Sequence, residues 1–287
     1  MEKTSKRKFH GSFKVVAIIV SIIFGIYALT MVYPVFWAFL MSFKSSKEYR
    51  FNAYGMPEQW RFDNYIKAFS ELVVDGNNYW DMTWNSIWYT FGTATLGISA
   101  LTIGAYFCAK YKTWAGDYLY WCSLLSMVIP IGASLGSQLV MTRQLNIYDS
   151  PLNMINATGA VGMEMLIMRA TFKGIDNTYT EAAYLDGASH WQIFVKINLP
   201  MAMPVCLAYF MQHAMTLWND AIGVFLFYPS YPTLNSGLYI YQQNAERVLA
   251  FPILYAGLLM SAIPSIILFL ALRNNMFNIK ITGALKQ

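Results

Sequence analysis

Charged side chains are scarce in this sequence. Of its 287 residues only 12% are Asp, Glu, Lys or Arg, whereas 56% are hydrophobic and 17% are aromatic. A soluble domain carries about a quarter charged residues, so the charges here are too few to cover the surface of soluble domains of this total length. The composition therefore excludes a disordered chain and a coiled coil, and it indicates a membrane protein.

Cysteine is also rare, and the motifs that bind metals or nucleotides are missing. Cys108, Cys122 and Cys206 stand alone in apolar runs, so there is no CxxC pair and neither a disulfide framework nor a zinc site is predicted. The sequence contains no G-x4-GK[ST] loop and no HExxH. Its GASLG string at 132–136 lies inside a long apolar run, where the two glycines fit close helix crossings. We therefore expect no catalytic residue, no metal and no cofactor on this chain, and any ATP hydrolysis has to reside on another polypeptide.

Long uncharged stretches dominate the sequence instead. A helix needs about 20 apolar residues to cross a bilayer. Runs free of charge, two of them extended past the single acids Glu164 and Asp220, predict six transmembrane helices at 15–43, 82–109, 118–142, 150–168, 203–227 and 248–272. The first run far exceeds the roughly 7–15 apolar residues of a signal peptide and lacks an A-x-A site, so we expect a retained helix. The stretch 228–248 is rich in Pro, Ser, Tyr and Asn and is predicted to be a loop.

Lysine and arginine are distributed unevenly between the segments that join these spans. With the N-terminus inside, the inner segments carry 13 Lys and Arg and the outer segments carry 7. The inner segments are 1–14, 110–117, 169–196 and 273–287, and the outer segments are 44–81, 143–149 and 246–247. The positive-inside rule then predicts cytoplasmic tails at 1–14 and 273–287, an extracytoplasmic loop at 44–81 and a five-helix core over 82–272.

The inner loop at 173–200 carries consistent local signals. Thr178 and Glu181 form an S/T-x-x-E capping box, which predicts that a helix starts at Thr178. Gly187 is suited to a left-handed helix stop. Ser189 and Gln192 form a second box, which predicts another helix running into the fifth span.

The first of these two helices has only about two turns and is unstable alone, because its nucleation cost is not recovered. It must dock on something. Ala182 and Ala183 allow close approach, Tyr184 and Leu185 offer apolar contact, and Glu181 can face a basic partner. The residues alone leave two interpretations open, a connector packed on its own bundle and a helix that docks on a partner protein.

These residues carry a family resemblance. Glu181-Ala182-Ala183, then Gly187 after three residues, then Ile197-x-Leu199-Pro200 after nine more, resembles the EAA loop of binding-protein-dependent ABC importer permeases. The pattern also lies where that loop belongs, between the fourth and fifth spans. Asn85-Ser86, Trp218-Asn219-Asp220 and the ending TGALK are similar to carbohydrate importer permeases of the maltose type.

The resemblance implies an all-α, six-helix polytopic membrane protein with the type I ABC importer permease fold, located in the bacterial plasma membrane. Its partners would be a second homologous permease, an ABC ATPase dimer holding ATP and Mg, and an extracytoplasmic solute-binding protein. The substrate would be a carbohydrate, most simply an oligosaccharide. The residues implied to couple to the ATPase are Glu181, Ala182, Ala183, Tyr184, Leu185, Asp186, Gly187, Ile197, Leu199 and Pro200. The residues implied to contact the binding protein are Tyr231, Asn235, Tyr239 and Tyr241. The tail at 282–287 would reach the ATPase interface.

Polar residues inside the spans are candidates for a translocation pathway. Glu164 and Asp220 are acids expected at membrane depth, where a charge is costly and faces a partner or a water-filled cavity. Asp220 follows Trp218 and Asn219, which together offer an aromatic face and hydrogen-bonding groups of the kind that bind sugars. A structural contact between helices is the alternative for these residues, and it is the expected role of His213.

An ion-coupled secondary transporter is the rival function. That class predicts an inverted repeat and helices interrupted at mid-membrane. Neither feature is evident in the sequence, and such a transporter has no need of an EAA loop.

Overall fold

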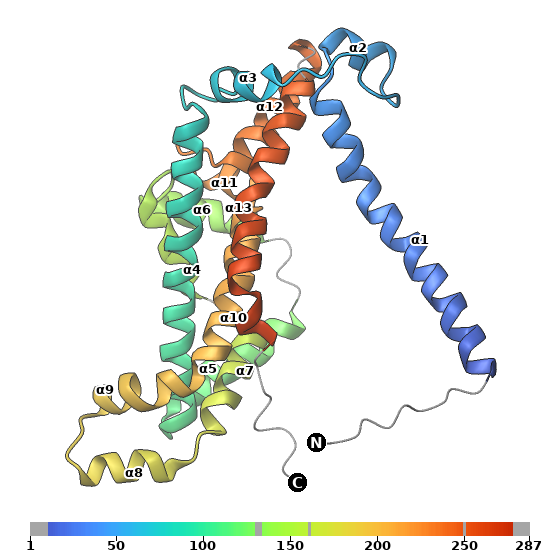
Figure 1. The fold of residues 1–287 in the computed structure, drawn as a ribbon. Helices are drawn as coiled ribbons and strands as arrows, with labels where there is room; N and C mark the ends of the chain where they lie inside the picture. Colours follow the sequence, from blue (N-terminus) through green and yellow to red (C-terminus); the bar gives the residue numbers. More distant parts are fainter. Residues whose placement is uncertain (1–10, 130–133, 160–161, 249–250, 278–287) are drawn as a thin grey trace.

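The computed structural model describes residues 11–129, 134–159, 162–248 and 251–277, which form helices and loops without a β-sheet (Figure 1). The α-helices are α1 (Gly11–Ser42), α2 (Ser46–Phe51), α3 (Asp63–Glu71), α4 (Tyr79–Lys110), α5 (Trp114–Val128), α6 (Ser134–Gln144), α7 (Met163–Lys173), α8 (Asn177–Leu185), α9 (His190–Ile193), α10 (Leu199–Trp218), α11 (Ala221–Phe227), α12 (Leu234–Val248) and α13 (Phe251–Phe277). A 3-10 helix, η1 (Pro151–Gly159), precedes α7, and a π-helix, η2 (Phe194–Asn198), joins α9 to α10. Most of both predicted tails, including the predicted ATPase contact at 282–287, lies outside the described residues.

Four helical segments of the described chain are long and apolar enough to cross a membrane: Val15–Ser42, Tyr79–Lys110, His190–Trp218 and Phe251–Ala271. They correspond to the first, second, fifth and sixth predicted spans. The fifth lies earlier than the predicted 203–227, because α9, η2 and α10 follow one another without a break. The predicted end of that span is wrong, since α10 ends at Trp218 and Asp220 caps the separate helix α11.

The third and fourth predicted spans are each divided into shorter helices. α5 ends before residue 129 and α6 starts at residue 134, while η1 and α7 are separated by a segment that includes Gly162 at a φ of 141°. None of these four pieces approaches the roughly 20 residues of a spanning helix. The count of six spans therefore stays a prediction, in which two of the spans would each consist of two pieces.

The predicted loop at 228–248 is mostly wrong, because α12 occupies all of it except 228–233. Pro229 and Pro232 both lie before the first residue of the helix. The helix start is then fixed by a reciprocal pair, in which the Thr233 N–H donates to Ser236 Oγ at 2.8 Å and the Ser236 N–H donates to Thr233 Oγ1 at 3.3 Å. Thr-x-x-Ser is a local pattern that favours a helix start. The sequence analysis missed it because the surrounding segment is rich in Pro and Tyr.

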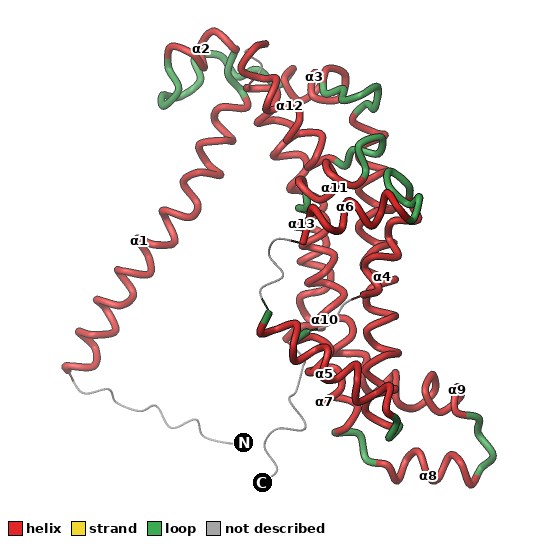
Figure 2. Tube along the Cα trace, turned by 180° about the vertical axis from the view of Figure 1, so that it is seen from behind, coloured by secondary structure: helices red, strands yellow, loops and turns green. Residues whose placement is uncertain are grey.

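Helix α1 leans away from the other helices and meets α13 near the end that carries α2 (Figures 1 and 2). Trp37 packs edge-on against Tyr255 at 5.3 Å between ring centroids. Over the greater part of its length α1 is apolar on all sides and exposed. A helix of this kind requires lipid or other membrane helices around it.

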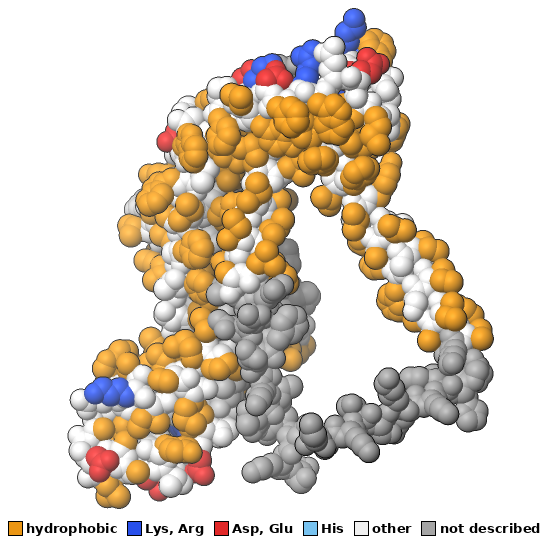
Figure 3. Space-filling model, in the orientation of Figure 1, with side chains coloured by type: hydrophobic (Ala, Val, Ile, Leu, Met, Phe, Trp, Pro, Cys, Tyr) orange, Lys and Arg blue, Asp and Glu red, His pale blue; other side chains and the backbone are white. Residues whose placement is uncertain are grey.

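Charged and apolar side chains are separated along the long axis of the molecule (Figure 3). Lys, Arg, Asp and Glu gather over α2 and α3 at one end and around α8 and α9 at the other. Hydrophobic side chains cover the stretch between these ends. This distribution matches a protein that crosses a bilayer, with its polar segments outside the hydrocarbon core.

Two buried clusters hold the helices together. The outer cluster joins α3, α4, α12 and α13 around Leu72, Met82 and Leu254. The inner cluster joins α4, α7 and α10, and Phe194 of η2 inserts into it. Phe194 lies 4.7 Å from Tyr106 between ring centroids. The segment that leaves α8 is therefore anchored in the packed core at the base of α4, α7 and α10.

Candidate functional site

Helix α8 lies at one end of the molecule, beyond α9 and away from the bundle (Figures 1 and 2). Its N-cap is Asp176, whose Oδ1 accepts hydrogen bonds from the Thr178 N–H at 2.9 Å and the Thr178 hydroxyl at 2.8 Å. The predicted capping box of Thr178 and Glu181 is wrong, because the stronger cap Asp176 lies two residues earlier. The Thr178 backbone bond and then its hydroxyl bond lower the pKa of Asp176, so the cap is lost only as the pH falls through that lowered pKa.

The end of α8 is a glycine corner, as predicted. Gly187 has a φ of 78°, in the left-handed region that favours glycine. The Gly187 N–H donates to the Tyr184 carbonyl at 3.0 Å, and the Ala188 N–H donates to the Ala183 carbonyl at 2.9 Å. These two bonds form a Schellman motif, which satisfies carbonyls that the helix end would otherwise leave unpaired.

The second predicted capping box is confirmed. The Ser189 N–H donates to Gln192 Oε1 at 2.8 Å, and the Gln192 N–H donates to Ser189 Oγ at 3.3 Å. The chain then continues through η2 into α10, with Ile197 and Leu199 half-buried and Pro200 exposed in the first turn. Both ends of the predicted EAA pattern therefore belong to one continuous, capped unit.

The exposed surface of α8 combines apolar and acidic side chains. Leu185 is 90% exposed and Tyr179 is 55% exposed, whereas Ala183 is the buried residue of the helix. Glu181 and Asp186 are also exposed, and residues 177–187 contain no Lys or Arg. An exposed leucine on a capped helix is suited to burial in an apolar cleft of a partner protein. The acidic side chains beside it are suited to basic side chains at the edge of that cleft.

Three side chains outside the predicted coupling residues, those of Lys110, Tyr111 and His190, tie α8 to the bundle. Lys110, the last residue of α4, donates to the Ile175 carbonyl and to Asn177 Oδ1, both at 2.8 Å. At the other end of α8, Tyr184 hydrogen-bonds to His190, which also bonds to Tyr111. No local pattern marks Lys110 or Tyr111 as partners, because each lies more than 60 residues from the residues that it contacts.

Two of the candidate pathway residues, Trp218 and Asp220, are engaged in contacts with other helices. The buried Trp218 donates its indole N–H to the Ser261 carbonyl at 3.1 Å. Asp220 caps α11 by accepting from the Gly223 N–H at 2.8 Å, and it accepts from the Tyr89 hydroxyl at 3.1 Å. Asn219 is exposed, and its amide donates to the carbonyl of Met215 in its own helix. The geometry of Trp218 and Asp220 fits the structural alternative.

Glu164 has a partner on another helix. Glu164 Oε2 lies 2.7 Å from His213 Nε2, which joins the first turn of α7 to α10, and both side chains are 27% exposed. His213 is thus a contact between helices, in agreement with the sequence analysis. Gln212 and Thr216 are exposed on α10, and Asn219, the residue that caps its C-terminus, is exposed as well. Their spacings of four and three residues place the three side chains on one face of the helix. This polar face of α10 (Gln212, Thr216 and Asn219) was not predicted as a unit.

The four candidates for contact with the binding protein are all half-buried. Asn235 donates to the Trp218 carbonyl, and its Oδ1 accepts from the Ser261 hydroxyl. Tyr231 lies edge-on to Trp88, Tyr239 packs against Phe225, and Tyr241 packs on the outer cluster. They all lie in or beside α12, towards the end of the molecule opposite α8 (Figure 1).

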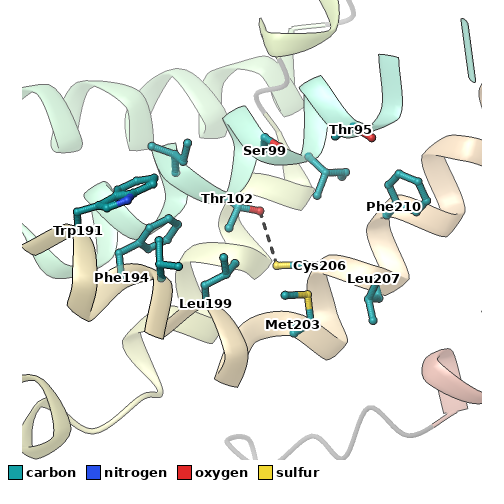
Figure 4. A pocket seen from close by; sticks show the side chains of 13 residues that line it. Thr95, Ser99, Thr102, Trp191, Phe194, Leu199, Met203, Cys206, Leu207 and Phe210 are labelled. Atoms are coloured by element: carbon teal, nitrogen blue, oxygen red, sulfur yellow. Dashed lines mark hydrogen bonds between the residues drawn. The ribbon is translucent and has the colours of Figure 1, made fainter. Parts of the chain in front are cut away.

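A cavity of about 370 Å³ lies between α4 and the α9–α10 segment (Figure 4). Its lining is almost wholly apolar, with Trp191 and Phe194 on one side and Phe210 on the other. The Thr102 hydroxyl and the Cys206 thiol meet across it at 3.7 Å. Within the described ranges no cluster of His, Cys, Asp or Glu could hold a metal ion.

Similar proteins are membrane components of sugar uptake systems. The chain is 22% identical over 270 residues to the diacetylchitobiose uptake system permease protein NgcG of Streptomyces coelicolor, covering 91% of this chain and 85% of that protein. It is 25% identical over 254 residues to the maltodextrin transport system permease protein MalD of Streptococcus pneumoniae, covering 86% and 88%.

The same fold occurs in a crystal structure of a bacterial ABC transporter that imports the acidic polysaccharide alginate. The match has a TM-score of 0.78 and 21% sequence identity, and it covers 93% of this chain and 98% of that one. Residues 100–276, which extend from α4 to α13 and include α8, match the family model for the binding-protein-dependent transport system inner membrane component. The chain therefore belongs to the family of inner membrane components of binding-protein-dependent transport systems.

Proposed function

We propose that this chain is one of two permease subunits of an ATP-driven importer of an oligosaccharide. Its partners are a second permease, an ATPase dimer that binds ATP and Mg, and an extracytoplasmic solute-binding protein. The observation that carries the proposal is α8, a short helix capped at both ends that holds Leu185 and Glu181 in water at the end of the molecule. The diacetylchitobiose and maltodextrin permeases named above support the choice of an oligosaccharide.

The mechanism follows from how α8 is attached. When ATP closes the ATPase dimer, α8 moves with the ATPase subunit on which it is seated. Because α9, η2 and α10 are continuous, and Phe194 is packed in the inner cluster, the displacement passes into the bundle as a rigid-body movement. The energy comes from the tighter fit of one permease conformation to the ATP-bound dimer, and this chain contributes no catalytic residue.

The orientation in the membrane follows from the same docking. The end that carries α8 faces the cytoplasm. α1 begins in the same half of the molecule and α13 ends there, which supports cytoplasmic N- and C-termini (Figure 1). The opposite end, with α2, α3 and α12, then faces the binding protein, and Tyr231, Asn235, Tyr239 and Tyr241 lie on that side.

The polar face of α10 supports a sugar pathway. Gln212, Thr216 and Asn219 place an amide, a hydroxyl and another amide along one exposed face of a helix that crosses the membrane. Polar groups at membrane depth face water or a partner, and uncharged donors and acceptors suit sugar hydroxyls. The pair formed by Glu164 and His213 lies beside this face. We propose this face as the part of the pathway contributed by this chain, and it takes over the role expected of Trp218 and Asp220.

Replacing Gln212 with leucine should lower the uptake rate roughly three- to tenfold, the effect of one lost hydrogen bond to the substrate. Met203→Leu, a change at another exposed position of α10, is the matched control and should leave uptake unchanged. The measurement is uptake of labelled oligosaccharide at a saturating concentration of loaded binding protein. Equal uptake by the Gln212→Leu variant and the wild type would exclude this face from the pathway.

Reconstitution tests the function as a whole. The complete complex is placed in proteoliposomes with its binding protein and a panel of labelled chito- and maltooligosaccharides. The proposal predicts uptake of at least one of these sugars only when ATP and the binding protein are both present. Uptake driven by an ion gradient without ATP would support the secondary transporter instead, a class to which the divided helices at α5–α6 and η1–α7 are also suited.

A further inference from the structure

His190 lies at the point where three elements of the structure meet. It is the first residue of α9, and its Nδ1 is 2.5 Å from the hydroxyl oxygen of Tyr184 in α8. The same Nδ1 is 2.9 Å from the hydroxyl oxygen of Tyr111, the residue that caps the C-terminus of α4. The imidazole also packs on both rings, with centroid distances of 5.2 Å to Tyr184 and 5.8 Å to Tyr111.

This contact gives the C-terminal end of α8 a second connection to the bundle, in addition to the contacts of Lys110 at the N-terminal end of the helix. The covalent route runs from α8 through the corner at Gly187 to α9 and α10. The route through His190 runs instead from Tyr184 to Tyr111 and so to the end of α4, which packs against α7 and α10 in the inner cluster. With the covalent route alone, the C-terminal end of α8 could swing about the glycine corner. With both, its orientation relative to α4 is fixed.

We propose that His190 is a positioning residue, which holds α8 in a fixed orientation by bridging Tyr184 to Tyr111 and so transmits the movement of α8 to α4. This inference rests on the proposed function, because α8 must be driven by an ATPase for its orientation to matter. It adds α4 as a second recipient of the displacement. His190 contacts neither the sugar nor the nucleotide.

The chemistry of the three groups is suited to a bridge. In the neutral tautomer with the proton on Nε2, Nδ1 accepts one tyrosine O–H, and the other tyrosine can donate to the first hydroxyl oxygen. Desolvation and the nearby Tyr111 hydroxyl raise the pKa of Tyr184, so its hydroxyl keeps its proton at neutral pH. His190 is exposed, and both of its hydrogen bonds to the tyrosines use Nδ1. Only the Nδ1 position carries the bridge.

That asymmetry gives a sharp test. An asparagine side chain places its polar group where Nδ1 lies, a glutamine places it nearer to Nε2, and a leucine has none. We expect His190→Asn to retain the number of sugar molecules imported per ATP hydrolysed. His190→Gln and His190→Leu should each lower that ratio at least threefold, while the complex still hydrolyses ATP. The measurement is parallel uptake and phosphate release in proteoliposomes that contain the complete complex.

The hydroxyl variants provide a second arm in case the histidine variants assemble poorly. Tyr111→Phe removes one oxygen atom and should lower the same ratio. Combined with His190→Leu, it should lower the ratio by less than the product of the two single effects, because both changes break the same bridge. A merely structural role would lower the yield or thermal stability of the complex and leave the ratio unchanged. Equal ratios for the asparagine and glutamine variants, or a wild-type ratio for His190→Leu, would overturn the proposal.

These outcomes are distinguishable from failure of the proposed function. If uptake does not depend on ATP in the wild-type complex, the function itself is wrong and the ratio has no meaning. If uptake depends on ATP and is lost on changing Leu185, while every His190 variant couples normally, the function stands and only the bridge is refuted.

Discussion

Replacing Leu185 with aspartate should abolish ATP-driven sugar uptake while leaving the permease folded and inserted. The leucine is 90% exposed in the isolated chain, so it contributes little to folding. Seated in a cleft of the ATPase, it would become a buried apolar anchor, and a carboxylate there would have to be desolvated without a partner. Loss of a central anchor of this kind weakens binding by about 2 kcal/mol or more, which corresponds to at least roughly thirtyfold.

The control for this experiment is Leu185→Met, which keeps an apolar side chain of similar size and should retain uptake. Both variants are compared in proteoliposomes at equal permease content. The ATPase is added at a concentration low enough for weaker docking by the aspartate variant to reduce uptake. Normal uptake by Leu185→Asp under those conditions would show that α8 does not dock through this side chain.

Replacing Gly187 with proline should have an effect of similar size, for a different reason. Proline holds φ near −65° and cannot reach the 78° of this corner, and it removes the N–H that donates to the Tyr184 carbonyl. The Schellman motif would open and α8 would lose its orientation to α9. We expect the amount of sugar imported per ATP to fall to background, while ATP hydrolysis continues.

Other substitutions at Gly187 separate backbone conformation from side-chain bulk. No atom lies within 4 Å of the position that a Cβ would occupy, so added volume alone costs nothing. Asparagine tolerates the left-handed region better than alanine does. The expected order of coupling is therefore Gly, Asn, Ala and then Pro. Coupling by the proline variant equal to that of the wild type would refute the role of the corner.

The corner and the second capping box could be predicted from sequence because each depends on residues a few positions apart. Gly187 stops a helix through its own backbone freedom, and Ser189 and Gln192 satisfy one another. The error at Thr178 has the same local origin. Two good caps lay within two residues of one another, and Asp176 prevailed because its carboxylate accepts two hydrogen bonds from Thr178.

The charged residues at membrane depth could not be interpreted in the same way. Asp220 was a candidate for sugar binding because a carboxylate in the membrane is costly. Its partner Tyr89 is 131 positions away, and no pattern in the sequence places the two side chains together. The bridge from Tyr184 through His190 to Tyr111 was invisible for the same reason, since Tyr111 and His190 are 79 positions apart.

Long apolar runs correctly predicted that four of the spans exist, because the ability of a helix to cross a membrane depends on its length and average composition more than on the exact order of its residues. Composition did not reveal where a run is interrupted. The divided third and fourth spans and the helix α12 depend on short local signals, such as Gly162 and the pair of Thr233 and Ser236, which an average over 20 residues conceals.

In the proposed mechanism an ATPase seated on α8 drives this permease, and native mass spectrometry of the tagged chain in mild detergent detects that ATPase. We expect a wild-type complex with one copy of this chain, one second permease and two ATPase subunits. We expect Leu185→Asp to retain the second permease and to lose the ATPase. A chain that is active in transport and carries no ATPase would refute the mechanism.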